Sequence, residues 1–127
     1  MDENAIAQEI VDAAYHVHVE LGPGLLESVY EAILDHELRR RGLDCIRQKR
    51  VPIKFRGVEL DEAFRLDLLV NDLVIVEIKS VEQASPVHAK QVLTYLRLTD
   101  KRLGLLLNFG QARMKDGIER IANGLPD

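Results

Sequence analysis

The feature that most constrains the fold is a hydrophobic run interrupted by three charged residues. Residues 65–80 read RLDLLVNDLVIVEIKS, in which Leu, Val and Ile surround Asp67, Glu77 and Lys79. This composition predicts a buried β-hairpin. Charged side chains are almost never fully buried unless they are paired or bind a metal. The hairpin therefore has to bring its charges together or leave them at an exposed end.

Side-chain alternation predicts how the two strands of the hairpin pair, because successive residues point to opposite faces. Matching the two wholly apolar faces predicts three cross-strand pairs: Val70 with Val74, Leu68 with Val76, and Leu66 with Ile78. This register needs a three-residue connection at 71–73, or a two-residue turn with a bulge. It places Asp67 opposite Glu77, with Lys79 two residues further along the same face.

The predicted register brings two like charges together. Carboxylates at cross-strand distance, on the order of 5 Å between Cβ atoms, repel each other. Two converging carboxylates also make a binding site for a hard divalent cation such as Mg²⁺. Alternatively, Lys79 pairs with one of the acids at a strand end that faces solvent. The spacing alone leaves both interpretations open.

Apolar periodicity along the chain predicts an α/β fold with a mixed β-sheet flanked by helices. The expected elements, in order, are helices at 3–21 and 25–41, extended segments at 43–55, 58–70 and 73–79, a helix at 86–98 and a strand at 103–109. The tail after Gly110 is ambiguous, and we expect a short edge strand followed by a few helical residues within 118–122. At 127 residues the chain is long enough for one domain, expected to span 1–127.

Composition excludes several classes of protein. The single cysteine, Cys45, excludes an internal disulfide framework and a multi-cysteine zinc site. No apolar run approaches the length needed to cross a membrane, and the acidic start MDENAIAQ is unlike a signal peptide. We therefore expect a cytoplasmic protein without membrane contact.

Charge is unevenly distributed along the chain. The net charge of −4 argues against a protein that coats nucleic acid non-specifically. Residues 39–56 nevertheless contain eight of the 17 basic residues and one acid, Asp44. This segment fits either a solvated helix end with a favourable dipole interaction or a surface that faces phosphates.

Three motifs give the chain a family resemblance. Asp67, nine further residues and Glu77-Ile78-Lys79 resemble the D…(D/E)xK signature of the PD-(D/E)XK nuclease superfamily. Residues 24–30, GLLESVY, are similar to the motif of the GxxExxY protein family within that superfamily. Residues 91–95, QVLTY, resemble the QxxxY element of several branches. The proline of the superfamily's name is replaced by Leu66. The resemblance implies a restriction-endonuclease-like αβββαβ core.

The resemblance implies a divalent-metal-dependent nuclease that uses Mg²⁺ or Mn²⁺ to hydrolyse phosphodiester bonds in DNA or RNA. The expected metal ligands are Asp67, Glu77, Glu27 and the backbone carbonyl of Ile78. Lys79 is expected to position or help deprotonate the attacking water and to stabilise the charge that develops on the phosphate. Without the resemblance, the preferred interpretation of Glu27 is a first-turn glutamate favoured by the helix dipole.

Further expected site residues come from the helices. Gln91 and Tyr95, four residues apart, share one helix face. We expect Gln91 to bond the metal-bound water or Lys79, and Tyr95 to reach a phosphate or an active-site carboxylate. The alternative is a packing tyrosine beside a solvated glutamine. The expected substrate-binding residues are Tyr30, which is alternatively a half-buried core tyrosine, His88, which is alternatively a surface histidine, and Arg65.

Two other functions remain open on the sequence. A non-catalytic module that binds nucleic acid or protein could use the same fold. The chain could also be one subunit of a larger nucleic-acid-processing assembly that supplies specificity, as a homodimer or with a partner subunit. Few aromatic residues, 5% of the chain, favour recognition of the nucleic-acid backbone and shape over base stacking.

Overall fold

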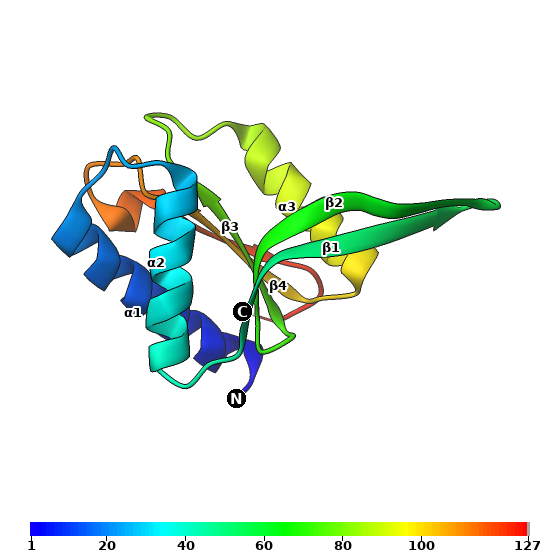
Figure 1. The fold of residues 1–127 in the computed structure, drawn as a ribbon, viewed down its shortest axis with the longest axis horizontal. Helices are drawn as coiled ribbons and strands as arrows, with labels where there is room; N and C mark the ends of the chain where they lie inside the picture. The colour runs from blue at the N-terminus through cyan, green and yellow to red at the C-terminus, as the bar shows by residue number, and fades with distance from the viewer. Residues whose placement is uncertain (127) are drawn as a thin grey trace.

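The computed structural model describes residues 1–126, which form a five-stranded mixed sheet covered by helices on both faces (Figure 1). The elements are α1 (Glu3–Leu21), α2 (Glu27–Arg40), β1 (Cys45–Phe55), β2 (Val58–Val70), β3 (Val74–Lys79), α3 (Pro86–Thr99), β4 (Leu103–Asn108), the 3₁₀ turn η1 (Met114–Gly117) and β5 (Ile118–Ala122). The strands lie in the order β1-β2-β3-β4-β5, and only β3 and β4 run parallel. The predicted α/β fold class is confirmed.

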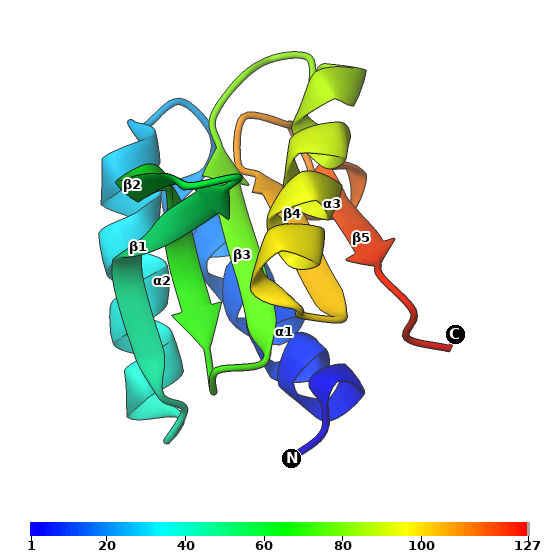
Figure 2. The same cartoon turned by 90° about the vertical axis from the view of Figure 1, so that its right-hand side faces the viewer.

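Helices on the two faces of the sheet create two hydrophobic cores. Helices α1 and α2 lie on one face and α3 on the other (Figures 1 and 2). Alternate residues of β3 divide between them, so that Val74 and Val76 face α1 and α2 while Ile75 faces α3. Strands β3 and β4 are therefore buried on both sides, which explains their nearly continuous apolar sequence.

The connection between β2 and β3 has the predicted three residues. Asn71 and Asp72 both adopt positive φ, 52° and 57°, and the Leu73 N–H donates to the Val70 carbonyl at 3.0 Å. Two of the three predicted pairs form: Val70 with Val74 and Leu68 with Val76. The polar turn residues and the apolar pattern together select this register.

The prediction that Leu66 shares a face with Leu68 and pairs with Ile78 is wrong. The ladder between β2 and β3 ends at the pair Leu68–Val76. Leu66 instead packs in the core on the α3 side, with Val92 and other residues of that face. Strand β2 leaves the sheet here and continues with β1 as a two-stranded ribbon (Figure 1). Strict alternation assumes a strand that stays in one sheet, and this strand does not.

The predicted helical residues in 118–122 are also wrong, because this segment is strand β5. Its backbone pairs with β4 in antiparallel register, beginning at Ile118 opposite Leu107. Ile118 and Ile121 have helical spacing, but the open edge of β4 offers unpaired backbone groups that a strand satisfies. Gly117 permits the approach, since a Cβ there would lie 2.1 Å from the Asn108 carbonyl oxygen. No helix in the described part of the chain is long and apolar enough to cross a bilayer.

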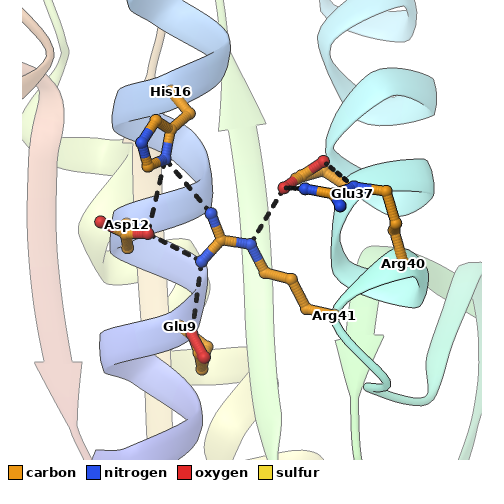
Figure 3. Close-up of polar contacts among 6 residues, drawn as sticks. All are labelled: Glu9, Asp12, His16, Glu37, Arg40 and Arg41. Carbon is orange, nitrogen blue, oxygen red and sulfur yellow. Dashed lines mark hydrogen bonds and ion pairs between the residues drawn. The ribbon is translucent and has the colours of Figure 1, made fainter.

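Arg41 fixes α2 against α1 (Figure 3). Its guanidinium donates to Asp12 at 2.8 Å and to Glu9 at 3.3 Å on α1, and to Glu37 on α2 at 3.1 Å. Hydrogen bonds from Arg40 and Arg41 lower the pKa of Glu37 to about 2. The helix-end part of the basic segment is thus neutralised within the protein.

We expect Arg41→Gln to lower the free energy of unfolding by about 1–3 kcal/mol, because it removes charge-assisted hydrogen bonds. Urea unfolding at pH 7 measures this loss, with Arg120→Gln on β5 as the exposed control. The pKa of Glu37 is lowered on folding, so its contribution is complete above pH 4.5 and is lost as the pH falls through about 2. The difference in free energy of unfolding between wild type and Arg41→Gln should therefore become smaller at low pH. A difference that stays constant from pH 7 to pH 2.5 would contradict the pairing of Arg41 with Glu37.

Candidate active site

Two carboxylates converge where β2 separates from β3. The Asp67 N–H donates to Glu77 Oε1 at 3.2 Å, and the Ile78 N–H donates to Asp67 Oδ2 at 2.8 Å. Each carboxylate thus accepts a hydrogen bond from a backbone N–H group that lies beyond the last cross-strand pair, Leu68 and Val76. The predicted convergence of Asp67 and Glu77 is present, and it arises from strands that part rather than from a continuous ladder.

Burial and the neighbouring acid keep Glu77 protonated in the metal-free protein. Its side chain is 6% exposed. Burial, followed by the charge of Asp67 and a hydrogen bond with it, raises the pKa of Glu77 to about 9, while Lys79 acts in the opposite direction. A cation bound between the two acids would offset this repulsion and favour the ionised carboxylate.

Lys79 stands at the end of β3, two residues beyond Glu77. Its side chain is partly exposed, and its strand position pairs with Asn108 of β4. The Asn108 side chain accepts from the N–H groups of Val81 and Gly110, which holds the loop that follows Lys79. The lysine therefore has a fixed backbone and a side chain free to reach a ligand near Glu77.

Helix α3 brings Tyr95 toward the two acids, whereas Gln91 is exposed. The pKa of Tyr95 is raised by burial and by the charges of Glu77 and Asp67, and its ring stacks on Phe64 with 4.2 Å between centroids. No hydrogen bond joins Gln91 to Lys79 or to the acids within the described residues. His88, one turn earlier, is half-buried, and its Nδ1 is buried without a hydrogen-bond partner among residues 1–126.

Tyr30 holds the loop that leads into α2 and does not reach solvent. The side chain is 0% exposed, and its ring stacks on Phe109 with 4.5 Å between centroids. Its hydroxyl donates to the Gly22 carbonyl and accepts from the Leu25 N–H at 3.2 Å. The expected contact of Tyr30 with substrate is therefore corrected, because a buried and doubly bonded hydroxyl cannot touch a ligand.

Glu27 is exposed at the first residue of α2, near the end of β3. The Ser80 hydroxyl donates to the Leu25 carbonyl at 2.6 Å and ties this loop to the residue after Lys79. Within residues 1–126, however, no three His, Cys, Asp or Glu side chains are grouped so that they could hold a metal. The structure thus does not bring Glu27 to Asp67 and Glu77 as a third ligand.

Two residues of the site were missed from the sequence. Gln48, with a φ of 52°, donates from Nε2 to Glu31 at 2.6 Å and to Asp67 at 3.4 Å. Glu31 is buried, and Arg47 pairs with it at 3.0 Å. Glu31 lies one helical turn after Glu27, which is visible in the sequence, but nothing in the sequence indicates that Gln48 meets either acid. Arg65, expected to bind substrate, is exposed and bonds Glu62.

The family model of the PD-(D/E)XK nuclease superfamily matches residues 4–121. The chain belongs to the PD-(D/E)XK nuclease superfamily. Proteins of this superfamily are generally nucleases that use divalent metal ions. Neither the search of curated proteins nor the search of solved structures returns a match.

The acids of this PD-(D/E)XK chain fit a divalent cation. Mg²⁺ prefers oxygen ligands, keeps several waters and is commonly held by one or two carboxylates together with substrate phosphates. Asp67 and Glu77 supply two carboxyl groups at one place, and burial, followed by the charge of Asp67, raises the pKa of Glu77. The donor set therefore suits a hard cation, with the remaining positions left to water and substrate.

Stability of the metal-free protein should fall with rising pH because of Glu77. The unfolded residue ionises near 4.5 and the folded one near 9, so between these values only the folded state holds the proton. The free energy of unfolding should then decrease by up to about 1.4 kcal/mol per pH unit. Urea unfolding in EDTA at pH 5 and pH 8 measures the slope. Glu77→Gln should reduce the slope of unfolding free energy against pH, whereas Glu119→Gln, an exposed control, should leave the slope unchanged. Equal slopes in wild type and both variants would contradict the burial of an uncompensated acid.

Gln48→Gly should weaken the site without unfolding it, since glycine accepts the positive φ while losing the amide that contacts Asp67. Partners that orient metal ligands typically contribute 10- to 100-fold in affinity or activity. We expect about that loss in Mn²⁺ affinity by titration calorimetry. Asp100→Gly, at another non-glycine position with positive φ, is the matched control. Unchanged Mn²⁺ affinity in Gln48→Gly would show that Gln48 does not position Asp67.

Proposed function

We propose that this chain is a divalent-metal-dependent nuclease that hydrolyses phosphodiester bonds of DNA or RNA with Mg²⁺ or Mn²⁺. The observation that carries the proposal is the convergence of Asp67 and Glu77 at a buried point beside Lys79. The GLLESVY motif at 24–30 supports the GxxExxY branch as the finer assignment. The single reduced cysteine supports a cytoplasmic location, and the match over residues 4–121 supports a single domain.

Each residue of the site has a role that follows from its position. Asp67 and Glu77 would hold the cation, with the Ile78 carbonyl as a further oxygen next to Glu77. The chemistry supplied by a cation held there would be neutralisation of charge on the phosphate and activation of the attacking water. The Lys79 ammonium, on a flexible stem, holds the attacking water by hydrogen bonding and stabilises negative charge on the phosphate oxygens.

Helix α3 and the loop before α2 would complete the substrate site. Burial and the charges of both acids raise the pKa of Tyr95, which supports a role for its hydroxyl in contacting a phosphate or a carboxylate. The unpartnered Nδ1 of His88 is a hydrogen-bonding group that a substrate could satisfy. Gln91, on the exposed side of the same helix, and Glu27, at the start of α2, would join only after substrate or metal draws them in.

A non-catalytic module is the second candidate function. It is favoured by the two-carboxylate grouping, which lacks a third acid within the described residues. A protein of this kind would bind nucleic acid, alone or as a subunit of a larger assembly, without cleaving it.

The decisive experiment compares wild type with Lys79→Ala on single- and double-stranded DNA and RNA in Mg²⁺ or Mn²⁺. Wild type should cleave at least one substrate, and loss of Lys79 should reduce the rate at least about 100-fold. Lys115→Ala, which removes an exposed lysine on η1, is the control and should cleave normally.

Two results would contradict the proposed nuclease function. Equal rates for wild type and Lys79→Ala would mean that Lys79 does not act in the reaction. Retained substrate binding without cleavage by wild type, in either metal, would favour the binding module.

A further inference from the structure

A two-stranded ribbon extends from the sheet beside the candidate active site. Strand β2 has 13 residues, of which only Leu68, Leu69 and Val70 pair with β3. Beyond these residues β2 pairs with β1 alone, through a register shift between Val51 and Ile53, out to Phe55 opposite Val58. In Figure 1 this ribbon projects well beyond the sheet and helices, while at its base Phe64 stacks on Tyr95 of α3. Among residues 1–126, no other helix or strand covers the tip of the ribbon.

The tip of the ribbon has an apolar face exposed to solvent. Phe55 lies opposite Val58, and Ile53 lies opposite Leu60, so alternation places all four on one face. Phe55, Val58 and Leu60 are 63%, 56% and 54% exposed. An isolated ribbon gains nothing from such a face in water, which indicates that something covers it.

The ribbon also carries an excess of basic charge, with six basic residues within 47–66 against three acids, Glu59, Asp61 and Glu62. From Arg47 to Arg56 the chain has five basic residues and no acid. Arg50 lies directly opposite Arg65, and the two guanidinium groups share one carboxylate, that of Glu62. This contrasts with Arg41, whose charge is neutralised by partners on α1 and α2.

The acids near these cations do not remove their charge. Arg50 approaches Glu62 at 3.6 Å and Lys54 approaches Glu59 at 3.4 Å, and both basic side chains are highly exposed. Pairs of this kind contribute little, so a polyanion can replace the acids. At the tip, the Arg56 guanidinium lies 5.2 Å from the centre of the Phe55 ring, which joins a cation to the apolar face.

We propose that the β1–β2 ribbon is an arm that grips double-stranded DNA, with Arg50, Lys54 and Arg56 on the phosphates and the Phe55 face in a groove. The proposal rests on the proposed nuclease function. A two-stranded ribbon fits the major groove of B-DNA, whereas the deep, narrow major groove of duplex RNA excludes it. Apolar side chains flanked by Arg and Lys are also used to enter DNA grooves.

Continuity with the acids favours DNA over a second copy of this acidic chain as the occupant. Arg65 and Asp67 stand two residues apart on β2, at the point where the ribbon leaves the sheet. A duplex bound along the ribbon would thus reach the two acids, Asp67 and Glu77. A second copy could cover the apolar face, but a symmetric pair would set the basic residues of the two ribbons near each other.

Fluorescence anisotropy with 20-bp duplexes of DNA and RNA, in EDTA to prevent cleavage, tests the arm. We expect wild type to prefer DNA, and the triple variant Arg50→Gln/Lys54→Gln/Arg56→Gln to bind it at least about 10-fold more weakly. The slope of log K against log salt should decrease by about 2 to 3 in magnitude, since each lost phosphate contact contributes about 0.9. Phe55→Ser should reduce the preference for DNA over RNA.

The matched control is Arg113→Gln/Lys115→Gln/Arg120→Gln, which makes the same charge change near β5, at the opposite edge of the sheet. It should bind DNA within twofold of wild type. Circular dichroism checks that all variants remain folded, and the exposed positions favour this. Equal loss in both triple variants would mean a non-specific charge effect and would overturn the proposal.

Three other outcomes would also overturn the proposal that the ribbon is a DNA-binding arm. These are an absence of DNA binding by wild type at 50 mM salt, ribbon-dependent binding of duplex RNA with equal affinity, and unchanged DNA affinity in the ribbon variant. A dimer that Phe55→Ser dissociates in light scattering, with DNA affinity unchanged, would identify a second copy as the occupant.

The arm and the nuclease can fail separately. Ribbon-dependent DNA binding by a wild type that cleaves nothing in Mg²⁺ or Mn²⁺ would reject the nuclease and retain the arm. Cleavage by wild type, together with unchanged DNA affinity in the ribbon variant, would reject the proposal of a DNA-binding arm and retain the proposed nuclease function.

Discussion

Burial of Glu77 beside Asp67 is the constraint on which the site depends. A buried pair of acids is unfavourable unless protons, hydrogen bonds or a cation compensate it. The protein uses two of these in its metal-free form: backbone N–H groups bond both carboxylates, and Glu77 keeps a proton. Helices on both faces make this possible, because they bury β3 from Val74 to Ile78, Glu77 included.

The departure of β2 from β3 links the site to the ribbon. Where the two strands separate, backbone donors become free for the carboxylates, and the same divergence sends β1 and β2 out beyond the sheet. Gln48 sits at this point on β1, in a backbone conformation rare for glutamine, and contacts both Glu31 and Asp67. Such local strain persists only where surrounding contacts enforce it, and it concentrates at functional sites.

Much of the fold could be predicted from the sequence, because apolar patterns report burial. The order of elements, the three-residue turn and the meeting of Asp67 with Glu77 all followed from alternation and turn chemistry. Errors arose where distant contacts overrode the local pattern. Leu66 packs in the core on the α3 side instead of the core under α1 and α2, and residues 118–122 form a strand at the edge of β4. Tyr30 was misjudged for a related reason, since its buried hydroxyl bonds a loop that its spacing does not reveal.

The sequence by itself determined which residues are available for chemistry and which strand faces match, since charge and apolar alternation are local properties. It also placed eight basic residues within 39–56. Only the tertiary structure decided how those charges divide, with Arg41 neutralised between two helices and Arg50 exposed on the ribbon. Likewise, only packing raised the pKa of Glu77, because desolvation depends on what covers a residue and not on its neighbours in sequence.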